Sequence, residues 1–388
     1  AHLFRTWYDG FFTVLFGGLA LWAVVAAVRF LAGADFTILR VNLALFMVGR
    51  FPRDQLWRPA MALVLLAILA GFLLGVATAS ARARARESGL PYQAATPMGV
   101  LARFWPALAT VGMLLLLTET LGPALAVTGA FVAGIGTRLA ASRAPAWFRR
   151  WAWLIELGLV VAIYRILVGG GVTWNGWGGL HLNLFLTIAG ILFAFPLGLL
   201  LALGRRSSLP TVRWMSVTYI ELIRGVPLIT LLLMGVFALG FFLPDTLRPG
   251  PIVRVLVAIT LFESAYIAEV VRGGLQAVPA GQVEASQALG MPAWKTTRLI
   301  VLPQALRATI PAMVGQFISL YKDTTLVLIV GQLDLLSVSG VANSQPAFLA
   351  QGLEVLTLAF VALLFWVGSY VMSREARRLE KRLGVGER

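Results

Sequence analysis

Residues 281–303, GQVEASQALGMPAWKTTRLIVLP, form a polar stretch in an otherwise very apolar chain. The apolar runs 252–273 and 309–333 flank this stretch. Each run is long enough to cross a bilayer, which takes about 20 apolar residues. A folded polar segment between two membrane spans indicates a loop with a function of its own.

The local pattern of this stretch predicts two short helices joined by a tight turn. Helix-forming residues follow Pro279, and Gly290 can adopt the left-handed conformation that ends a helix. Pro292 fits the first turn of a second helix, and we expect Pro303 to end it. If this segment has only a structural role, it is an interfacial helix pair that stabilises the fold. If it has a function of its own, it is a docking element for a cytoplasmic protein.

The composition is that of an all-α, polytopic integral membrane protein. Of the 388 residues, 59% are hydrophobic and 13% are charged, whereas a soluble chain has about 25% charged residues. The first apolar run is longer than the apolar region of a signal peptide. We count about ten spans, at 7–32, 60–80, 104–120, 123–140, 151–169, 182–203, 215–243, 252–273, 309–333 and 350–372. A single span with a re-entrant piece is the alternative for 104–140.

The charge distribution predicts the orientation of these spans. The net charge of +15 comes from short basic loops between apolar runs, as the positive-inside rule requires, so nucleic acid is not implied. Basic loops at 81–103, 138–150 and 204–214 alternate with base-free loops at 170–181 and 334–349. We therefore expect the basic loops, the 274–308 loop and both termini to be cytoplasmic.

The segment 33–59 does not fit this alternation, because it is basic where a periplasmic loop is expected. It carries Arg40, Arg50, Arg53 and Arg58, and we expect an amphipathic helix along the membrane interface.

Chemistry that needs a metal or a thiol is not expected. The sequence has no cysteine, and its histidines, His2 and His181, are too few and too far apart for a metal pair. We expect no cofactor and no metal in this chain.

Charged residues inside the spans are functional candidates, because burying charge in a membrane is costly. Glu221 and Arg224 are three residues apart, as are Glu269 and Arg272, so each set can pair on one helix face. The alternative is that these residues only brace packed helices near the cytoplasmic ends.

A second polar group lies deeper in the spans. The candidates for a water-filled path or solute site are Glu263, Lys322, Asp323, Thr324 and Thr325. A structural network is the alternative for this group.

The stretch EASQALGMPAWKTTRLIVLP resembles the EAA loop of ABC importer permeases. The motifs YIELIRGVPL, SAYIAEVVRGG, LPQALR and YKDTTL resemble the polar-amino-acid branch of that family. The resemblance covers 182–373, with a serine in place of the second alanine of the motif. The residues to which it gives a coupling role are Gly281, Glu284, Ala285, Ser286, Leu289, Gly290, Ile300, Leu302 and Pro303.

The resemblance implies a five-span type I permease core in a bacterial inner membrane. A cytoplasmic ABC ATPase dimer would dock on the EAA loop, a second permease chain would complete the pathway as a heterodimer, and a periplasmic binding protein would deliver the substrate. ATP and Mg²⁺ would bind to the ATPase, since this chain has no GxxxxGK[ST] phosphate loop. The chain itself would be a transport subunit and not an enzyme.

The resemblance also implies a division of the chain into regions. Residues 1–170 would be an accessory region of about five spans, 171–181 a periplasmic linker, 182–373 the core with its EAA loop at 276–308, and 374–388 a basic tail. This layout resembles the long permeases of general and acidic L-amino-acid systems, which carry glutamate, glutamine, aspartate and asparagine.

The sequence therefore predicts the permease subunit of an ABC importer for polar or acidic L-amino acids, working by alternating access. The first rival is an ion-coupled secondary transporter or channel that uses Glu263, Lys322 and Asp323 as a relay. That rival leaves the polar hairpin unexplained. The second rival, a membrane scaffold without a path, leaves the intramembrane charges unexplained.

Overall fold

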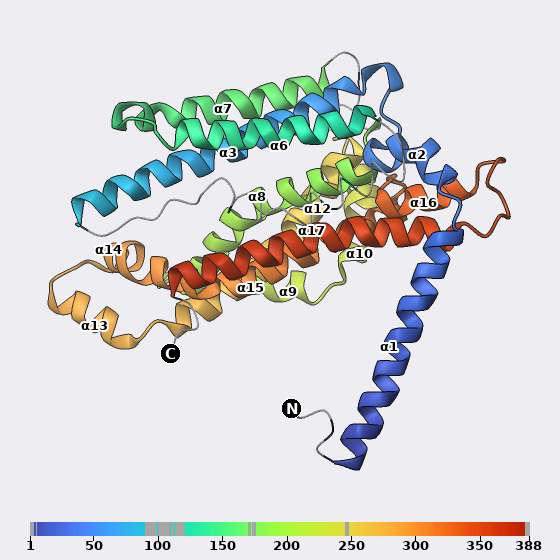
Figure 1. Cartoon of the computed structure of the whole chain (residues 1–388). Coiled ribbons are helices and arrows are strands. Elements are labelled where there is room, and N and C mark those ends of the chain that lie inside the picture. The colour runs from blue at the N-terminus through green and yellow to red at the C-terminus, as the bar shows by residue number, and fades with distance from the viewer. Residues whose placement is uncertain are drawn as a thin grey trace.

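The protein is described by a computed structural model at residues 4, 6–89, 99, 109, 112, 121–169, 172, 176–244 and 248–384. Within these residues the secondary structure is helical, apart from one isolated bridge between Gly179 and Asp334. Figure 1 shows long helices in a bundle, with the α13–α14 hairpin at one end and α16 at the other. The all-α membrane fold predicted from the sequence is confirmed.

The helices fall into an N-terminal group and a core group. The first group is α1 (Trp7–Gly33), α2 (Thr37–Val48), η1 (Arg53–Gln55), α3 (Trp57–Glu87), α6 (Leu121–Ala141) and α7 (Ala146–Val168). The core group begins with α8 (Gly179–Arg205), α9 (Pro210–Arg224), α10 (Leu228–Leu233), the π-turn η3 (Met234–Ala238), α11 (Leu239–Phe242) and α12 (Pro251–Ala277). It continues with α13 (Ala280–Ala288), α14 (Ala293–Thr296), the π-turn η5 (Thr297–Val301), α15 (Leu302–Asp323), the 3₁₀ helix η6 (Thr324–Val330), α16 (Leu335–Asn343) and α17 (Glu354–Leu383).

Among the described residues, eight helices are long and apolar enough to cross a membrane, and a bent pair could supply a ninth span. Of the ten spans expected from the sequence, 104–120 lies outside the described residues except at positions 109 and 112.

The predicted span 215–243 is not one straight helix, because the chain breaks in its middle. Helix α9 ends at Arg224 and α10 begins at Leu228, with a bend of 103° between the two segments. Pro227 lies at the break. It has no N–H for a helical hydrogen bond, and its ring disfavours a helical conformation of the residue before it.

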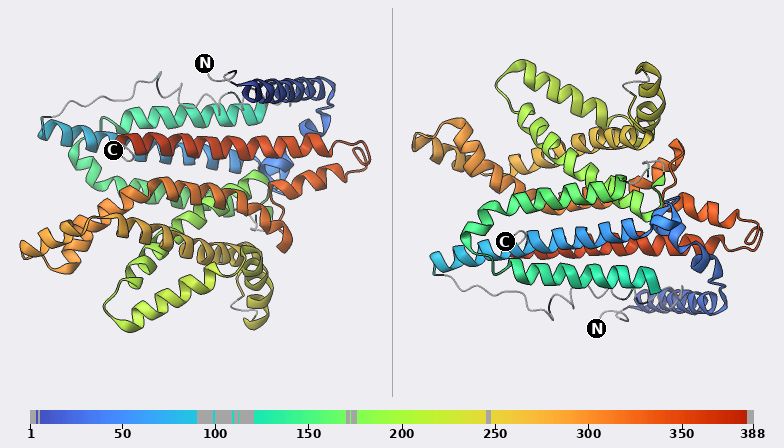
Figure 2. Two further views of the ribbon diagram at one scale, coloured as in Figure 1. Left: turned by 90° about the horizontal axis from the view of Figure 1, so that it is seen from below. Right: turned by 90° about the horizontal axis from the view of Figure 1, so that it is seen from above.

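Helix α12 lies at the centre of the core. Half of its most apolar window is buried inside the molecule, against none of the corresponding window of α1. Helices α8, α9 and α15 pack against α12, whereas α17 packs against α15 (Figure 2). Gly198 of α8 lies against Ile267 and the Ser264 carbonyl of α12, where a Cβ atom would approach that oxygen to 2.8 Å. A larger residue at this position would separate the two helices.

Helices α3, α6 and α7 form a layer along one side of the core (Figure 1). Within that layer, α3 and α6 touch through Gly71 and Gly134, whose backbones leave no room for a side chain. The layer joins the core through Ala62, Ile163 and Leu167, which belong to the same buried cluster as core residues of α8, α10 and α12. By contrast, α1 projects away from the bundle and contains no buried residue.

The segment 33–59 is amphipathic, as predicted, but it does not expose its apolar face to the membrane interface. Ile38, Leu39 and Phe46 of α2 are buried in one cluster with residues of α16 and α17. The ring centroids of Phe46 and Phe360 are 5.2 Å apart. The loop charges could not show this, because the partners of α2 lie about 300 residues further along the chain.

The end of the 171–181 linker is a packed joint and not a flexible tether. Trp177 is buried in the core cluster and does not face the membrane interface. Gly179 has φ +57, and a Cβ on it would lie 2.3 Å from the Phe46 carbonyl oxygen. Only glycine combines this backbone conformation with so close a contact. Its N–H donates to the Leu333 carbonyl at 2.8 Å.

The buried side-chain amide of Asn183 connects this joint to the C-terminal part of the core. Asn183 is fully buried in α8. Its Nδ2 donates to the Thr324 hydroxyl at 2.8 Å, and its Oδ1 accepts from the Leu335 N–H at 2.9 Å. A single side chain therefore joins α8, the start of η6 and the first turn of α16.

We expect Asn183→Leu to lower the free energy of unfolding by about 2–4 kcal/mol, because it leaves the Leu335 N–H buried without a partner and removes the hydrogen bond that the Thr324 hydroxyl accepts. Thermal unfolding in detergent, followed by the exposure of buried tryptophan, measures the loss. Leu184→Ala, at the neighbouring exposed position of α8, is the control and should change stability little. Equal stability of the two variants would contradict the role given to Asn183.

Two truncations separate the contributions of the N-terminal helices. Removing residues 1–34 deletes α1, which buries nothing, so thermal stability should stay near that of the whole chain. Removing residues 1–169 also deletes α2 and uncovers the apolar cluster on α16 and α17. We expect this shorter chain to insert and still to assemble with its partners, but with a lower Tm. Identical Tm values for the two truncations would show that α2 is dispensable.

Candidate functional site

The polar stretch at 281–303 begins as the predicted hairpin. Helix α13 ends in a Schellman motif, in which Met291 N–H donates to Ser286 O at 3.0 Å and Gly290 N–H donates to Gln287 O at 2.9 Å. Gly290 has φ +74, as predicted for a glycine in the left-handed conformation after a helix. Helix α14 then begins after Pro292.

The serine that replaces an alanine of the EAA motif closes the hairpin. The hydroxyls of Ser286 and Thr296 lie 2.9 Å apart, and both side chains are buried. Ser286 also donates to the Val283 carbonyl. The remaining surface is open: Glu284 is exposed, and Leu289 and Trp294 are 81% and 60% exposed. Hydrogen bonds within the hairpin thus hold its two helices together. Its exposed surface carries one negative charge and two large apolar side chains.

The expectation that Pro303 ends the second helix is wrong. The π-turn η5 separates α14 from α15, and Pro303 is the second residue of α15. Pro303 has no N–H to donate, and the π-turn directly before it marks a change in the helical hydrogen-bond pattern that lets the helix continue through this position. The whole segment from Ala293 to Val330 forms one helical rod of 38 residues. The hairpin is therefore attached directly to a membrane span.

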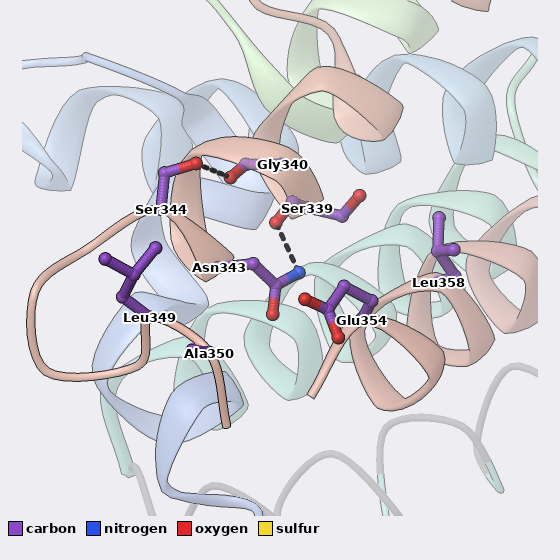
Figure 3. A pocket seen from close by; sticks show the side chains of 8 residues that line it. All are labelled: Ser339, Gly340, Asn343, Ser344, Leu349, Ala350, Glu354 and Leu358. Carbon is purple, nitrogen blue, oxygen red and sulfur yellow. Dashed lines mark hydrogen bonds between the residues drawn. The ribbon is translucent and has the colours of Figure 1, made fainter. Parts of the chain in front are cut away.

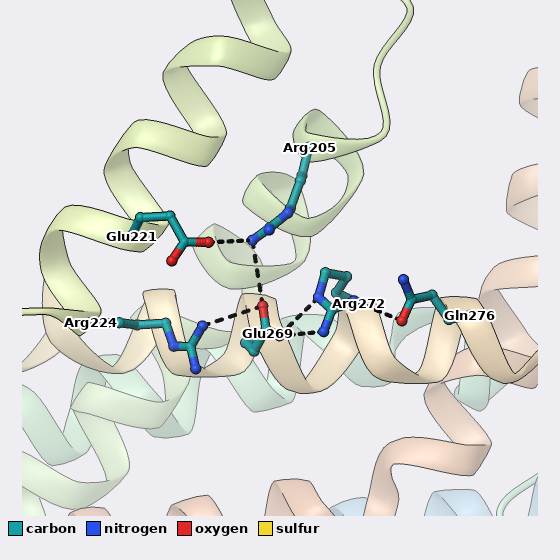
Figure 4. Close-up of polar contacts among 6 residues, drawn as sticks. All are labelled: Arg205, Glu221, Arg224, Glu269, Arg272 and Gln276. Carbon is teal, nitrogen blue, oxygen red and sulfur yellow. Dashed lines mark hydrogen bonds and ion pairs between the residues drawn. The ribbon is translucent and has the colours of Figure 1, made fainter.

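A cluster of charged side chains lies where α8, α9 and α12 meet (Figure 4). Glu269 pairs with Arg272, as predicted, with 2.9 Å between Nε and Oε1. The predicted pair of Glu221 and Arg224 does not form. Glu221 accepts from Arg205 of α8 at 3.1 Å, and Arg224 lies 3.5 Å from Glu269.

The physical reason is competition between partners. Spacing along α9 allows its two charges to meet, but Arg205 and Glu269 on the neighbouring helices offer each of them an opposite charge. Arg205 also contacts Glu269 at 3.5 Å. The five side chains therefore join three helices, which an i,i+3 pair on one helix cannot do.

A polar stripe follows one face of α15, opposite Glu263 of α12. Glu263 is fully buried. Its Oε2 accepts from the Gln316 amide at 2.9 Å, and its Oε1 has no partner within the described residues. One turn further, the Ser319 hydroxyl donates to Asp323 at 3.3 Å. Gln316, Ser319 and Asp323 are spaced i, i+3 and i+7, so they share one helix face.

The structure separates the four predicted residues from 322 to 325. Asp323 belongs to the polar stripe, and Lys322 is exposed. Thr324 is fully buried, bonded to Asn183 and to the Tyr321 carbonyl, so it serves the fold. Thr325 is half-buried and donates to the Lys322 carbonyl.

Two members of the stripe, Gln316 and Ser319, were not identified from the sequence. The signal was present, because polar residues at helical spacing before Asp323 interrupt an apolar span. No sequence pattern around Asn183 indicated its role, since its hydrogen-bond partners lie 141 and 152 residues further along the chain. The described residues contain no group of three or more His, Cys, Asp or Glu side chains that could hold a metal ion.

Comparison of the sequence with known proteins identifies its family. The family described as "Binding-protein-dependent transport system inner membrane component" matches residues 194–385, which include the hairpin and both polar clusters. The inner membrane amino-acid ABC transporter permease protein YhdY of Escherichia coli K12 is 45% identical over 240 residues, which are 61% of this chain and 64% of that protein. This chain thus spans just under two thirds of that relative.

A second relative matches over more of its length. The glutamate/glutamine/aspartate/asparagine transport system permease protein BztC of Rhodobacter capsulatus is 39% identical over 368 residues, 90% of this chain and 79% of that protein. Among solved structures, an amino acid ABC transporter chain is 29% identical at a TM-score of 0.46, over 52% of this chain and 90% of that one.

The BztC match extends well beyond the permease core, so the predicted resemblance to long amino-acid permeases is confirmed. The family match covers the hairpin motif from which the resemblance was first inferred. This chain belongs to the family of binding-protein-dependent transport system inner membrane components, the permeases of ABC importers.

Proposed function

We propose that this chain is the membrane-spanning permease subunit of an ABC importer for polar or acidic L-amino acids, and that it works by alternating access. The observation that carries the proposal is the hairpin of α13 and α14. It is fastened from within, it presents Glu284, Leu289 and Trp294 to its surroundings, and it continues into the rod that holds Asp323.

The partner at the hairpin is a cytoplasmic ABC ATPase dimer. The chain has no phosphate-binding loop of its own, so the energy must arrive through contact with another protein. Exposed leucine and tryptophan side chains beside a carboxylate are suited to a groove with an apolar floor and a basic rim. ATP and Mg²⁺ then bind to the ATPase and not to this chain.

The hairpin end of the bundle is cytoplasmic in this proposal. The arginine-rich end of α3, the turn between α6 and α7 and the end of α17 lie at the same end of the molecule as the hairpin (Figure 1). Their positive charge follows the positive-inside rule. A periplasmic binding protein delivers substrate at the opposite end, and a second permease chain completes the pathway.

The substrate class follows from the polar stripe and from the relatives. BztC is named for glutamate, glutamine, aspartate and asparagine. A zwitterion that crosses hydrocarbon needs partners for its carboxylate and its ammonium group, since unpaired charge costs several kcal/mol there. Lys322 offers a cation, whereas Asp323 and the free Oε1 of Glu263 offer acceptors. These groups line the substrate path.

The competing function is ion-coupled transport or a channel. The buried carboxylate of Glu263, bonded to Gln316 near Asp323, is an arrangement that a proton relay would also use. Uptake by proteoliposomes that lack the ATPase decides between the two. Transport driven by a proton gradient alone would support the relay, and transport that needs ATP and the ATPase supports the importer.

We expect Glu284→Lys and Leu289→Asp to reduce ATP-driven uptake at least tenfold while the chain still inserts and folds. Each puts an unfavourable charge on the surface that docks with the ATPase, and neither touches the Ser286–Thr296 contact. Copurification with the ATPase subunits and uptake in proteoliposomes measure the effect.

The matched control for the hairpin is Glu380→Lys, the same change of charge near the end of α17. It should leave both assembly and uptake close to wild type. Normal copurification and normal uptake by both hairpin variants would rule out the hairpin as the ATPase contact.

For the polar stripe and the neighbouring Thr325 we expect Gln316→Leu, Asp323→Asn and Thr325→Val to change uptake or substrate preference, with ATPase assembly intact. Gln316→Leu removes a hydrogen-bonding group and Asp323→Asn removes a negative charge from the face opposite Glu263, and a change of about tenfold in relative uptake of acidic and neutral amino acids is expected. Competition between labelled substrates at equal expression measures it.

The control for the stripe is Thr78→Val in α3, where the hydroxyl donates only to the Leu74 carbonyl of its own helix. It should have no effect on uptake. Because the second permease chain contributes to the same path, the equivalent positions of that chain are substituted in parallel. Unchanged kinetics in both sets would reduce the stripe to a structural network.

A further inference from the structure

A pocket of about 360 Å³ lies at the end of the molecule opposite the hairpin. It is enclosed by the last turn of α16, the loop 344–353 and the first turn of α17 (Figure 3). Its walls carry apolar side chains, Leu349 and Leu358, and polar ones, Asn343 and Glu354. None of these residues belongs to the hairpin or to the polar stripe.

The amide of Asn343 is oriented by its own hydrogen bonds. Its Nδ2 donates to the Ser339 carbonyl at 2.8 Å and to the Thr357 hydroxyl at 2.7 Å. A carbonyl oxygen can only accept, so the amide nitrogen must lie on that side. The Oδ1 atom is thereby turned the other way, where it is buried with no hydrogen-bond partner among the described residues. A buried acceptor left open in this way indicates a missing donor.

A carboxylate lines the same pocket. Glu354 of α17 contributes to its wall together with Asn343 and with Ala350 of the loop (Figure 3). Glu354 is the first residue of α17, where an acidic side chain also favours the helix dipole. The dipole explains the charge but not the open amide oxygen in the same pocket. None of the residues that line the pocket is a lysine or an arginine that could neutralise the charge.

We propose that this pocket binds a lysine or arginine side chain of the periplasmic binding protein. The inference rests on the proposed function, in which such a protein docks at this end. The cationic head donates to Asn343 Oδ1 and to the Glu354 carboxylate, and its methylene stem packs on Leu349 and Leu358, which are largely exposed in the free chain. The contact helps to fix where the delivered substrate meets the permease.

The position of the pocket favours a protein over a lipid as the source of the cation. The loop 344–353 projects beyond the ends of the long helices, away from the hairpin (Figure 1). A group at that height faces the aqueous compartment and not the headgroups around the bundle. The carboxylate also steers a basic surface toward the site, which raises the association rate and makes it dependent on salt.

The test uses the assembled transporter in nanodiscs, with the binding protein that stimulates its ATPase activity. We expect Glu354→Gln to weaken binding of that protein about tenfold and to flatten its salt dependence. Asn343→Leu, which removes the amide oxygen, should weaken binding as well. Asp54→Asn is the matched control, because it removes an exposed carboxylate outside the pocket, in the connection between α2 and α3, and should have no effect.

The outcomes separate this inference from the function on which it rests. If no binding protein stimulates the wild-type transporter, the importer itself is in doubt. If stimulation is normal and Glu354→Gln binds as tightly as Asp54→Asn, the pocket assignment is overturned.

Two further arms identify the source of the cation. Butylguanidinium, used as a small probe, should compete with the binding protein for the wild-type transporter but not for the Glu354→Gln variant. Equal competition for both would overturn the assignment. Replacing phosphatidylethanolamine by phosphatidylcholine should change nothing. Loss of binding on that replacement would assign the pocket to a lipid ammonium group and would also overturn the proposal.

Discussion

The buried side chain of Asn183 is the constraint on which the core depends. It holds the start of α8, the Thr324 hydroxyl and the Leu335 N–H together where no water can replace any of the three. Just before it, Gly179 is held against α2 and bonded to the Leu333 carbonyl. The joint therefore fixes α2, α8 and α16 relative to the end of the long rod that begins at α14.

This joint gives the rod one anchored end and one free end. From Ala293 to Val330 the chain is helical without a gap, with the hairpin at its exposed end and Thr324, tied to Asn183, near the other. The stripe of Gln316, Ser319 and Asp323 lies between the two. In the proposed importer, a push on the hairpin is carried along a stiff element past Glu263, because helices transmit displacement and loops absorb it.

The two polar clusters differ in what surrounds them. Around Glu269, three arginines face two carboxylates, so each carboxylate has an opposite charge beside it and the cluster joins three helices. Around Glu263, the Gln316 amide donates to one carboxylate oxygen, and the other oxygen has no hydrogen-bond partner within the described residues. A paired network stabilises a packed junction, whereas an open buried acceptor is costly unless something else uses it. That contrast is why the stripe, and not the ion cluster, is the candidate path.

The sequence by itself determined the membrane class, most of the spans and the hairpin, because these depend on apolar length and on local rules for Gly290 and Pro292. It also determined the pairing of Glu269 with Arg272, which needs only one helix turn. Tertiary structure decided the rest: the partners of Glu221 and Arg224, the burial of α2 and the joint at Asn183. At these sites the contacts join residues that lie far apart in the chain, and at Glu221 and Arg224 such residues displace the partner on the same helix. Periodicity along one segment cannot show which of them wins, since the energies depend on what the fold brings within reach.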